Sequence, residues 1–310
     1  MGFFKSLFGP KESDPELQRL AEMARDSKNA PEPQMELALA YMAKIKTPPN
    51  WNDDYAKRGV GAFQKAIKIA NRHAPAQIDS IRERFVETIH RVAMAYHTYH
   101  EKRFGLKWLE KAIWLLEQAM PVTTGHSDQV AQIRKGLSDC WVEVVTWHEE
   151  KLEDESAGED CLKKIVAASE RAMSYTDDEF MRNAIDYDAA GAQITIGFRY
   201  AVQANESAVL NRQDGKLLNV NDREHKEYAR QAIRLLRDGR TRLKPYTRSD
   251  DYEETMETTR DVLAGTYINL YNLTWAHSKM SQSIGILKEG VNVVPDDADL
   301  WTSLGNFSFR

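Results

Sequence analysis

The sequence has few cysteines, glycines and prolines, and each shortage excludes a class of protein. The two cysteines, Cys140 and Cys161, are too few for a disulfide scaffold. With 16 glycines and 10 prolines in 310 residues, the chain is neither collagen-like nor of low complexity. No leader with charged, apolar and small-residue regions opens it, so we expect a cytoplasmic protein.

A strong net charge and a long apolar run are lacking as well. The 42 basic and 47 acidic side chains give a formal net charge of -5, which argues against nonspecific binding of nucleic acid by the whole molecule. The longest stretch without Asp, Glu, Lys or Arg, residues 262–278, is too polar to span a bilayer. These features indicate a soluble, ordered chain.

Helical periodicity is what the sequence does contain. Between the prolines, apolar residues recur at three- and four-residue spacing, and no segment alternates as a strand would, so we predict an all-α fold. Thr176 and Glu179 have the spacing of a capping box, and Ser249 precedes two aspartates, so both mark helix starts. The predicted helices cover residues 14–27, 34–46, 52–74, 77–100, 103–120, 127–152, 158–175, 178–203, 222–244, 250–278, 281–292 and 297–310.

The openings of these helices repeat. The residues of one W-x-x-L-G-N opening are Trp301, Leu304, Gly305 and Asn306, and an equivalent opening begins 34 residues earlier at Tyr267. Further openings begin at Ile89, Trp141 and Gln193, at intervals of 52 residues. Small residues such as Gly59 and Gly197 would let paired helices approach closely. With these motifs the sequence resembles the tetratricopeptide-repeat superfamily over about residues 35–310, with longer helices than the standard repeat.

The resemblance implies a right-handed solenoid of antiparallel helical hairpins whose first helices line a concave groove. The helical repeat domain would span residues 14–310, with an insertion at about 204–221, after a short apolar and basic tail at 1–13. Asn272 and Asn306 lie one repeat apart, where this family commonly uses asparagine to hold a ligand's backbone. The remaining predicted groove residues are Ile268, Trp275, Phe198 and His90. We therefore expect a noncatalytic scaffold that binds a peptide or a partner helix.

A basic stripe supports a different kind of binding. Six cations fall within one narrow strip of the predicted helix 222–244, and no acid of that helix lies in the strip. They are Arg223, Lys226, Arg230, Arg234, Arg237 and Lys244. The strip is either a solvated face or a surface for anions, and in the second case the protein would be an adaptor for anionic lipid or nucleic acid.

Motifs for catalysis or metal binding are scarce. The sequence contains no phosphate-binding loop, nucleophile elbow or zinc-protease motif. Glu87 and His90 have the spacing of half of a carboxylate-bridged metal site, but such pairs arise by chance about as often as they occur here, and the second half is missing. We expect no cofactor and no enzymatic activity, with a helical metalloenzyme as the least favoured alternative.

The two ends of the chain carry apolar side chains. Phe3, Phe4, Leu7 and Phe8 share one helical face near two lysines, which indicates a disordered tail or a peripheral membrane contact. After the opening at Trp301 a second helix would normally follow. We therefore expect either a piece of a longer protein, a capping helix, or an apolar edge used for association.

Overall fold

The computed structural model describes residues 14–103, 105–123, 127–152, 158–210, 222–246, 252–275 and 280–308. These residues form twelve α-helices and three short 3-10 turns, with no strand among them, so the predicted all-α class is confirmed. Each helix corresponds to one predicted from the sequence. The largest difference is at α8, which continues to Leu210 and so includes the first part of the predicted insertion. The tail at 1–13 and residues 211–221 lie outside the described residues.

The chain divides into two compact units. Unit 1 is Met1–Trp147 with Ser174–Thr176, and unit 2 is His148–Met173 with Asp177–Arg310. Unit 1 contains α1 (Pro15–Asp26), α2 (Glu32–Ile45), α3 (Asp53–His73), α4 (Ile78–Arg103), α5 (Leu106–Ala119) and most of α6 (Ser127–Leu152). Unit 2 contains most of α7 (Glu159–Tyr175), then α8 (Glu179–Leu210), α9 (Asp222–Leu243), α10 (Tyr252–Trp275), α11 (Met280–Val293) and α12 (Ala298–Ser308).

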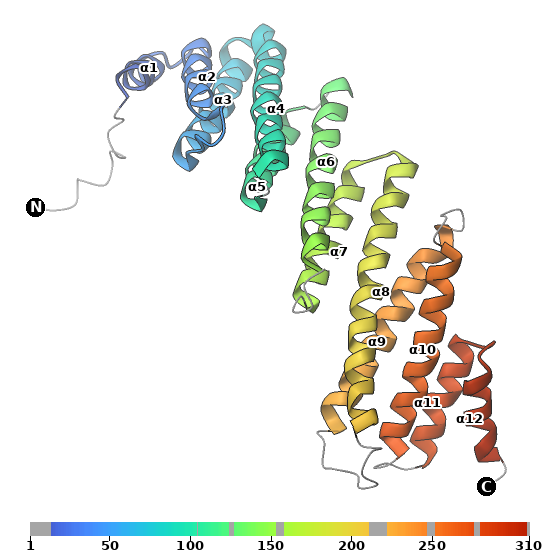
Figure 1. Cartoon of the computed structure of the whole chain (residues 1–310). Coiled ribbons are helices and arrows are strands. Elements are labelled where there is room, and N and C mark those ends of the chain that lie inside the picture. The colour runs from blue at the N-terminus through green and yellow to red at the C-terminus, as the bar shows by residue number, and fades with distance from the viewer. Residues whose placement is uncertain are drawn as a thin grey trace, which may run out of the picture. The chain divides into compact units, whose positions relative to one another are not determined.

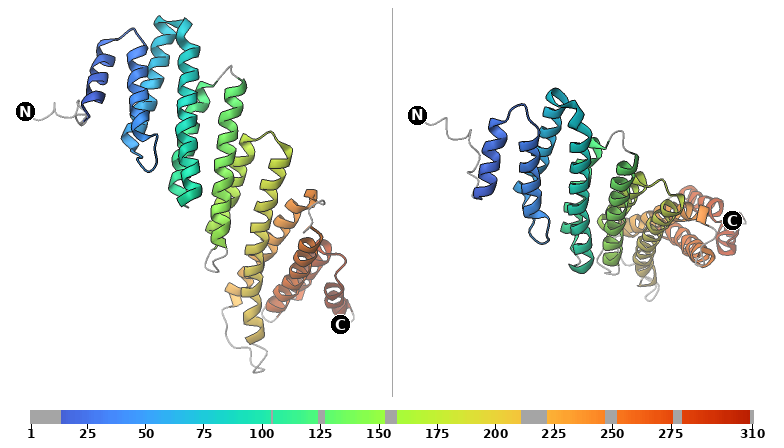
Figure 2. Two further views of the ribbon diagram at one scale, coloured as in Figure 1. Left: turned by 45° about the horizontal axis from the view of Figure 1, so that its top comes forward. Right: turned by 90° about the horizontal axis from the view of Figure 1, so that it is seen from above.

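Consecutive helices pack side by side within unit 1, from α1 to α5 (Figure 2). Gly59 of α3 allows the α2–α3 pair to approach closely, because a Cβ there would lie 2.6 Å from the terminal methyl carbon of Met42. The ring centroids of Phe63 and Phe85 are 4.8 Å apart, which joins α3 to α4. Tyr96 is fully buried and its hydroxyl donates to the Ile45 carbonyl oxygen at 2.8 Å. Aromatic packing therefore connects successive hairpins in this unit.

Unit 2 follows the same scheme around one apolar core. In the hairpins α8–α9 and α10–α11 each second helix packs along its first helix, and α10 also contacts α8 and α12 (Figure 1). Gly197 is required at the α8–α9 contact, because a Cβ there would lie 2.8 Å from Leu236 Cγ and 3.3 Å from the Leu236 backbone nitrogen. The core draws on α8 to α12, and its largest fully buried side chain is Tyr267.

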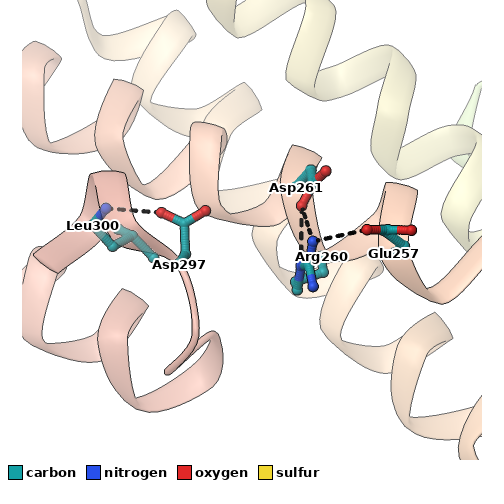
Figure 3. Close-up of polar contacts among 5 residues, drawn as sticks. All are labelled: Glu257, Arg260, Asp261, Asp297 and Leu300. Carbon is teal, nitrogen blue, oxygen red and sulfur yellow. Dashed lines mark hydrogen bonds and ion pairs between the residues drawn. The ribbon is translucent and has the colours of Figure 1, made fainter.

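Aspartates cap two first helices of unit 2. Asp178 precedes α8 and its Oδ1 accepts hydrogen bonds from the backbone nitrogens of Phe180 and Met181, at 2.9 and 3.4 Å. The cap is therefore Asp178 and not Thr176 as the capping-box spacing predicted. Asp297 precedes α12 and accepts from Leu300 N at 2.8 Å (Figure 3). The predicted start at Ser249 lies outside the described residues.

The last helix keeps one large apolar side chain exposed. The Trp301 side chain is 52% exposed, and its Nε1 donates to the Pro295 carbonyl oxygen at 2.6 Å. Leu304 is partly buried against the core of unit 2.

Candidate functional site

The predicted peptide-binding residues of unit 2 lie on three first helices that contact one another in series. Phe198 is on α8, Asn272 on α10 and Asn306 on α12, and α10 contacts both of the other helices. These three residues occupy the same position relative to their repeat openings at Gln193, Tyr267 and Trp301. Both asparagines are exposed, and Phe198 is half-buried against the core. We call the surface formed by these exposed sides of α8, α10 and α12 the first-helix surface.

The exposed strip of α10 shows what surrounds Asn272. One face of this helix carries Glu257, Asp261, Gly265 and Asn272 exposed, with Ile268 half-buried among them. At its amino-terminal end, Arg260 Nη2 donates to Asp261 Oδ1 at 2.8 Å and contacts Glu257 Oε1 at 3.4 Å (Figure 3). Arg260 therefore pairs with both of these acids at that end, and the other end of the strip carries the uncharged Ile268 and Asn272.

Not every predicted groove residue belongs to this surface. His90 lies in unit 1, where its Nδ1 is 3.2 Å from Gln132 Nε2 and burial lowers the pKa of its imidazole. Trp275 is the last residue of α10, and its side chain lies outside the described residues. The structure thus groups Phe198, Ile268, Asn272 and Asn306 within one unit, and their contact with a ligand stays a prediction.

Two residues near these were not singled out from the sequence. Val202, on the same face of α8 as Phe198, is 55% exposed and adds apolar area to the first-helix surface. Asn269 is the opposite case, because it is buried and its Nδ2 donates to the Ala204 carbonyl oxygen at 2.9 Å, which ties α10 to α8. The sequence signal for Val202 is its position four residues after Phe198. Asn269 and Asn272 differ in burial, which the sequence does not show.

The basic stripe is exposed, but acids from other helices reach it. Lys226 is partly buried, and the other five cations of the stripe are exposed. Arg234 Nη2 lies 2.9 Å from Glu159 Oε1 of α7, and Arg237 Nη1 lies 2.8 Å from Glu289 Oε1 of α11. A strip without acids in its own helix therefore still forms ion pairs between helices.

A groove of about 580 Å³ is bordered by α9, α10 and α11, and three arginines of the stripe line it. Tyr267 lies in its wall, and its hydroxyl donates to Glu289 Oε1 at 3.0 Å. Burial raises the pKa of this phenol above its ordinary value. The groove is lined by Arg230, Ile233, Arg234, Arg237, Asp238, Thr241, Tyr267, Leu270, Ile286 and Glu289.

A second groove of about 310 Å³ lies on the other side of α9, between α9 and α7. Its floor includes Gln193 of α8, and Arg234 and Asp238 line both grooves. Its lining residues are Glu159, Leu162, Lys163, Val166, Ala167, Glu170, Gln193, Arg234, Leu235 and Asp238.

Unit 1 has an aromatic cluster around Trp51, a residue that helical periodicity does not single out. The ring of Trp51 meets Tyr96 edge-on at 5.2 Å and Trp114 edge-on at 6.1 Å. Lys111 Nζ lies 5.1 Å from the centroid of the Trp51 ring and 3.0 Å from Asp53 Oδ1. The position of Trp51 in the segment before α3 gave no helical spacing from which this contact could be predicted.

The reactive side chains are mostly withdrawn from solvent. Burial raises the pKa of the Cys140 thiol to about 12, and Cys161 Sγ donates to the His148 carbonyl oxygen at 3.2 Å. His100 is buried with its Nε2 3.9 Å from Glu143 Oε2.

In the part of the chain that is described, no group of three or more His, Cys, Asp or Glu is arranged to hold a metal ion. No helix in that part combines the length and apolar character needed to cross a bilayer.

Neither a protein-family model nor a curated protein matches this sequence.

Proposed function

We propose that this chain is a noncatalytic interaction scaffold that binds a peptide segment or partner helix on its first-helix surface. The observation that carries the proposal is the pair Asn272 and Asn306, which are exposed at equivalent positions on the contacting helices α10 and α12. The helical pairing within each unit supports a tetratricopeptide-like arrangement, and we propose that the hairpins form a right-handed solenoid.

Asparagine suits this task because its carboxamide both donates and accepts hydrogen bonds. A peptide backbone offers one N–H and one C=O per residue, and two carboxamides on neighbouring helices would hold two such units in register. Half-buried Phe198 and Ile268, with exposed Val202, supply apolar contact area next to the polar anchors. Since the asparagines are already exposed, a ligand does not have to displace a core residue to reach them.

We propose a cytoplasmic location for this scaffold, because both cysteines are free thiols and the reducing cytosol keeps thiols in that state. The N-terminal residues would add a peripheral membrane contact. They lie outside the described residues.

The second candidate is an adaptor for anionic lipid or nucleic acid. It is favoured by the exposure of Arg223 and Arg230 on α9 and of Lys244 directly after that helix. The ion pairs of Arg234 and Arg237 weigh against it, because an incoming phosphate would have to displace Glu159 and Glu289. The two candidates differ in salt dependence. Binding through the stripe should weaken steeply as salt rises, and binding at the neutral asparagines should not.

Site-specific photo-cross-linking tests the first candidate. A benzophenone amino acid at position 272 or at position 306 should capture the same partner from the protein's own source cells. The matched control is position 288, because Lys288 is exposed on the second helix α11. Equal capture from all three positions, or different partners at 272 and 306, would contradict a shared binding surface.

A further inference from the structure

The groove between α7 and α9 contains a buried polar atom without a partner. Gln193 on its floor is 8% exposed, and among the described residues its Oε1 has no hydrogen-bond partner. Buried polar groups in native proteins nearly always have a partner, because desolvation without a hydrogen bond is costly. A ligand or an ordered water is therefore expected at this point.

The charged residues that line the groove are only partly paired with one another. Glu159 pairs with Arg234 at 2.9 Å and with Lys163 at 3.8 Å. Gln193 lies about one and a half turns of α9 beyond Arg234, because its Cβ is 3.4 Å from the point where a Cβ on Gly239 would lie, and Gly239 is five residues after Arg234.

Two other carboxylates of the groove lining lack a cation. Glu170 is eleven residues after Glu159 on α7, about 16 Å along the helix. Glu170 and Asp238 are both exposed, and neither forms an ion pair with any residue that the structure describes. Apart from the Glu159–Arg234 pair, the lining therefore offers two carboxylates and one buried carboxamide oxygen, all three of them acceptors.

We propose that this groove binds an arginine side chain of a partner protein. A guanidinium group has five N–H donors in a planar fork, which suits three acceptors on separate helices. Its methylene stem would lie along the apolar walls formed by Leu162, Val166 and Leu235. A volume of about 310 Å³ is at the lower end of the range for ligand sites, which fits one side chain better than a whole cofactor.

This site is separate from the first-helix surface. It is built from α7 and α9 and reaches α8 only at its floor, whereas the asparagines lie on α10 and α12. A partner seated on one surface does not require the other, so the two proposals fail independently.

Titration with capped tripeptides tests the proposal on the full chain. The probe is acetyl-Gly-Arg-Gly-amide, and its control carries citrulline, which keeps the shape of arginine and lacks the charge. We expect the arginine probe to bind saturably, to shift the side-chain amide NMR signals of Gln193, and to bind about tenfold more tightly than citrulline. The lysine tripeptide should bind more weakly than the arginine one. Equal affinity for arginine and citrulline, or for arginine and lysine, would overturn the assignment.

Substitutions locate the binding on the chain. Asp238→Asn and Glu170→Gln each change an exposed carboxylate to its amide, so they should preserve the fold and together weaken arginine binding about tenfold. Glu257→Gln on α10 is the matched control and should leave the affinity unchanged. Gln193→Met should abolish the remaining preference for arginine over citrulline. Unchanged affinity in the folded double variant, or no saturable binding by the arginine probe, would overturn the proposal and leave ordered water as the partner of Gln193.

Discussion

Arg237 on α9 donates a hydrogen bond to Glu289 on α11 at 2.8 Å, and so connects the second helices of two successive hairpins. The same carboxylate oxygen accepts from the Tyr267 hydroxyl at 3.0 Å. The basic stripe looks unpaired in the sequence, but two of its arginines form ion pairs that join α9 to α7 and to α11. Reversing its charges should therefore affect stability more than exposure alone suggests.

Arg237→Glu should lower the free energy of unfolding by about 1 kcal/mol, because it replaces an attraction with a repulsion beside Glu289. Adding Glu289→Arg to the same chain should recover most of that loss. Urea unfolding midpoints followed by circular dichroism measure both effects. Arg223→Glu is the control, since Arg223 is exposed and no described acid pairs with it. No recovery in the charge-swapped chain would show that the ion pair contributes nothing.

Gly197→Ala should destabilise the chain by about 1–3 kcal/mol, because the new methyl group would lie 2.8 Å from Leu236 Cγ at the α8–α9 contact. Gly191→Ala in the same helix should instead stabilise it by about 0.5–1 kcal/mol, since nothing lies within 4 Å of the added Cβ and alanine favours the helix. Thermal unfolding of the two variants should move in opposite directions. Equal changes in the unfolding temperatures of the two variants would contradict the claim that the close approach of α8 and α9 requires glycine at position 197.

Glu149 should make stability fall as the pH rises. Burial raises the pKa of its carboxyl from the ordinary 4.5 to about 7, and repulsion by Asp188 adds to this. Between pH 4.5 and 7 the folded state binds more protons than the unfolded state, so the free energy of unfolding decreases as the pH rises. Above pH 7 the carboxylate is charged in both states, and the whole free-energy cost of burying that charge remains.

Glu149→Gln removes that cost, and should stabilise the chain by about 1–2 kcal/mol at pH 8 with little effect at pH 4. Chemical denaturation at the two pH values measures the difference. Glu150→Gln is the neighbouring control, because Glu150 is exposed. The same gain at pH 4 and pH 8 would show that the carboxyl is not held protonated.

Iodoacetamide at pH 8 should label Cys161 before Cys140. Burial is the main reason that the pKa of the Cys140 thiol rises to about 12, so hardly any thiolate is present, and the side chain is fully buried. Cys161 is partly exposed. Peptide mapping of labelled chains gives the order, and urea should make the two rates converge. Faster labelling of Cys140 in the native chain would contradict its place in the core.

The sequence was sufficient to predict the helices because their periodicity is local. All twelve predicted helices occur in the described residues, and the small side chains at Gly59 and Gly197 lie where helices approach. The capping-box spacing predicts the cap of α8 two residues too early. Thr176 and Asp178 are both residue types that cap helices, and Asp178 is the cap because α8 begins at Glu179. Periodicity alone did not show that α8 continues to Leu210.

Features that depend on neighbouring helices could not be predicted. Glu159 and Glu289 reach the basic stripe from α7 and α11, and a helical projection of α9 alone contains neither acid. Asn269 and Asn272 are the same residue type three positions apart, yet one is buried and the other exposed. Gln193 was identified as a repeat opening, but its unpartnered oxygen in the α7–α9 groove depends on the packing of three helices.

The most direct test of the account is the affinity of the cross-linked partner segment for the chain with Asn272→Ala and Asn306→Ala, measured by isothermal titration calorimetry. Each lost amide should cost about 1–3 kcal/mol, so we predict that the double variant binds at least about tenfold more weakly while its thermal unfolding is unchanged. Asn292→Ala, which removes an exposed asparagine from the second helix α11, should bind as the unaltered chain does. Unchanged affinity in the folded double variant would contradict the claim that the first-helix surface holds the partner.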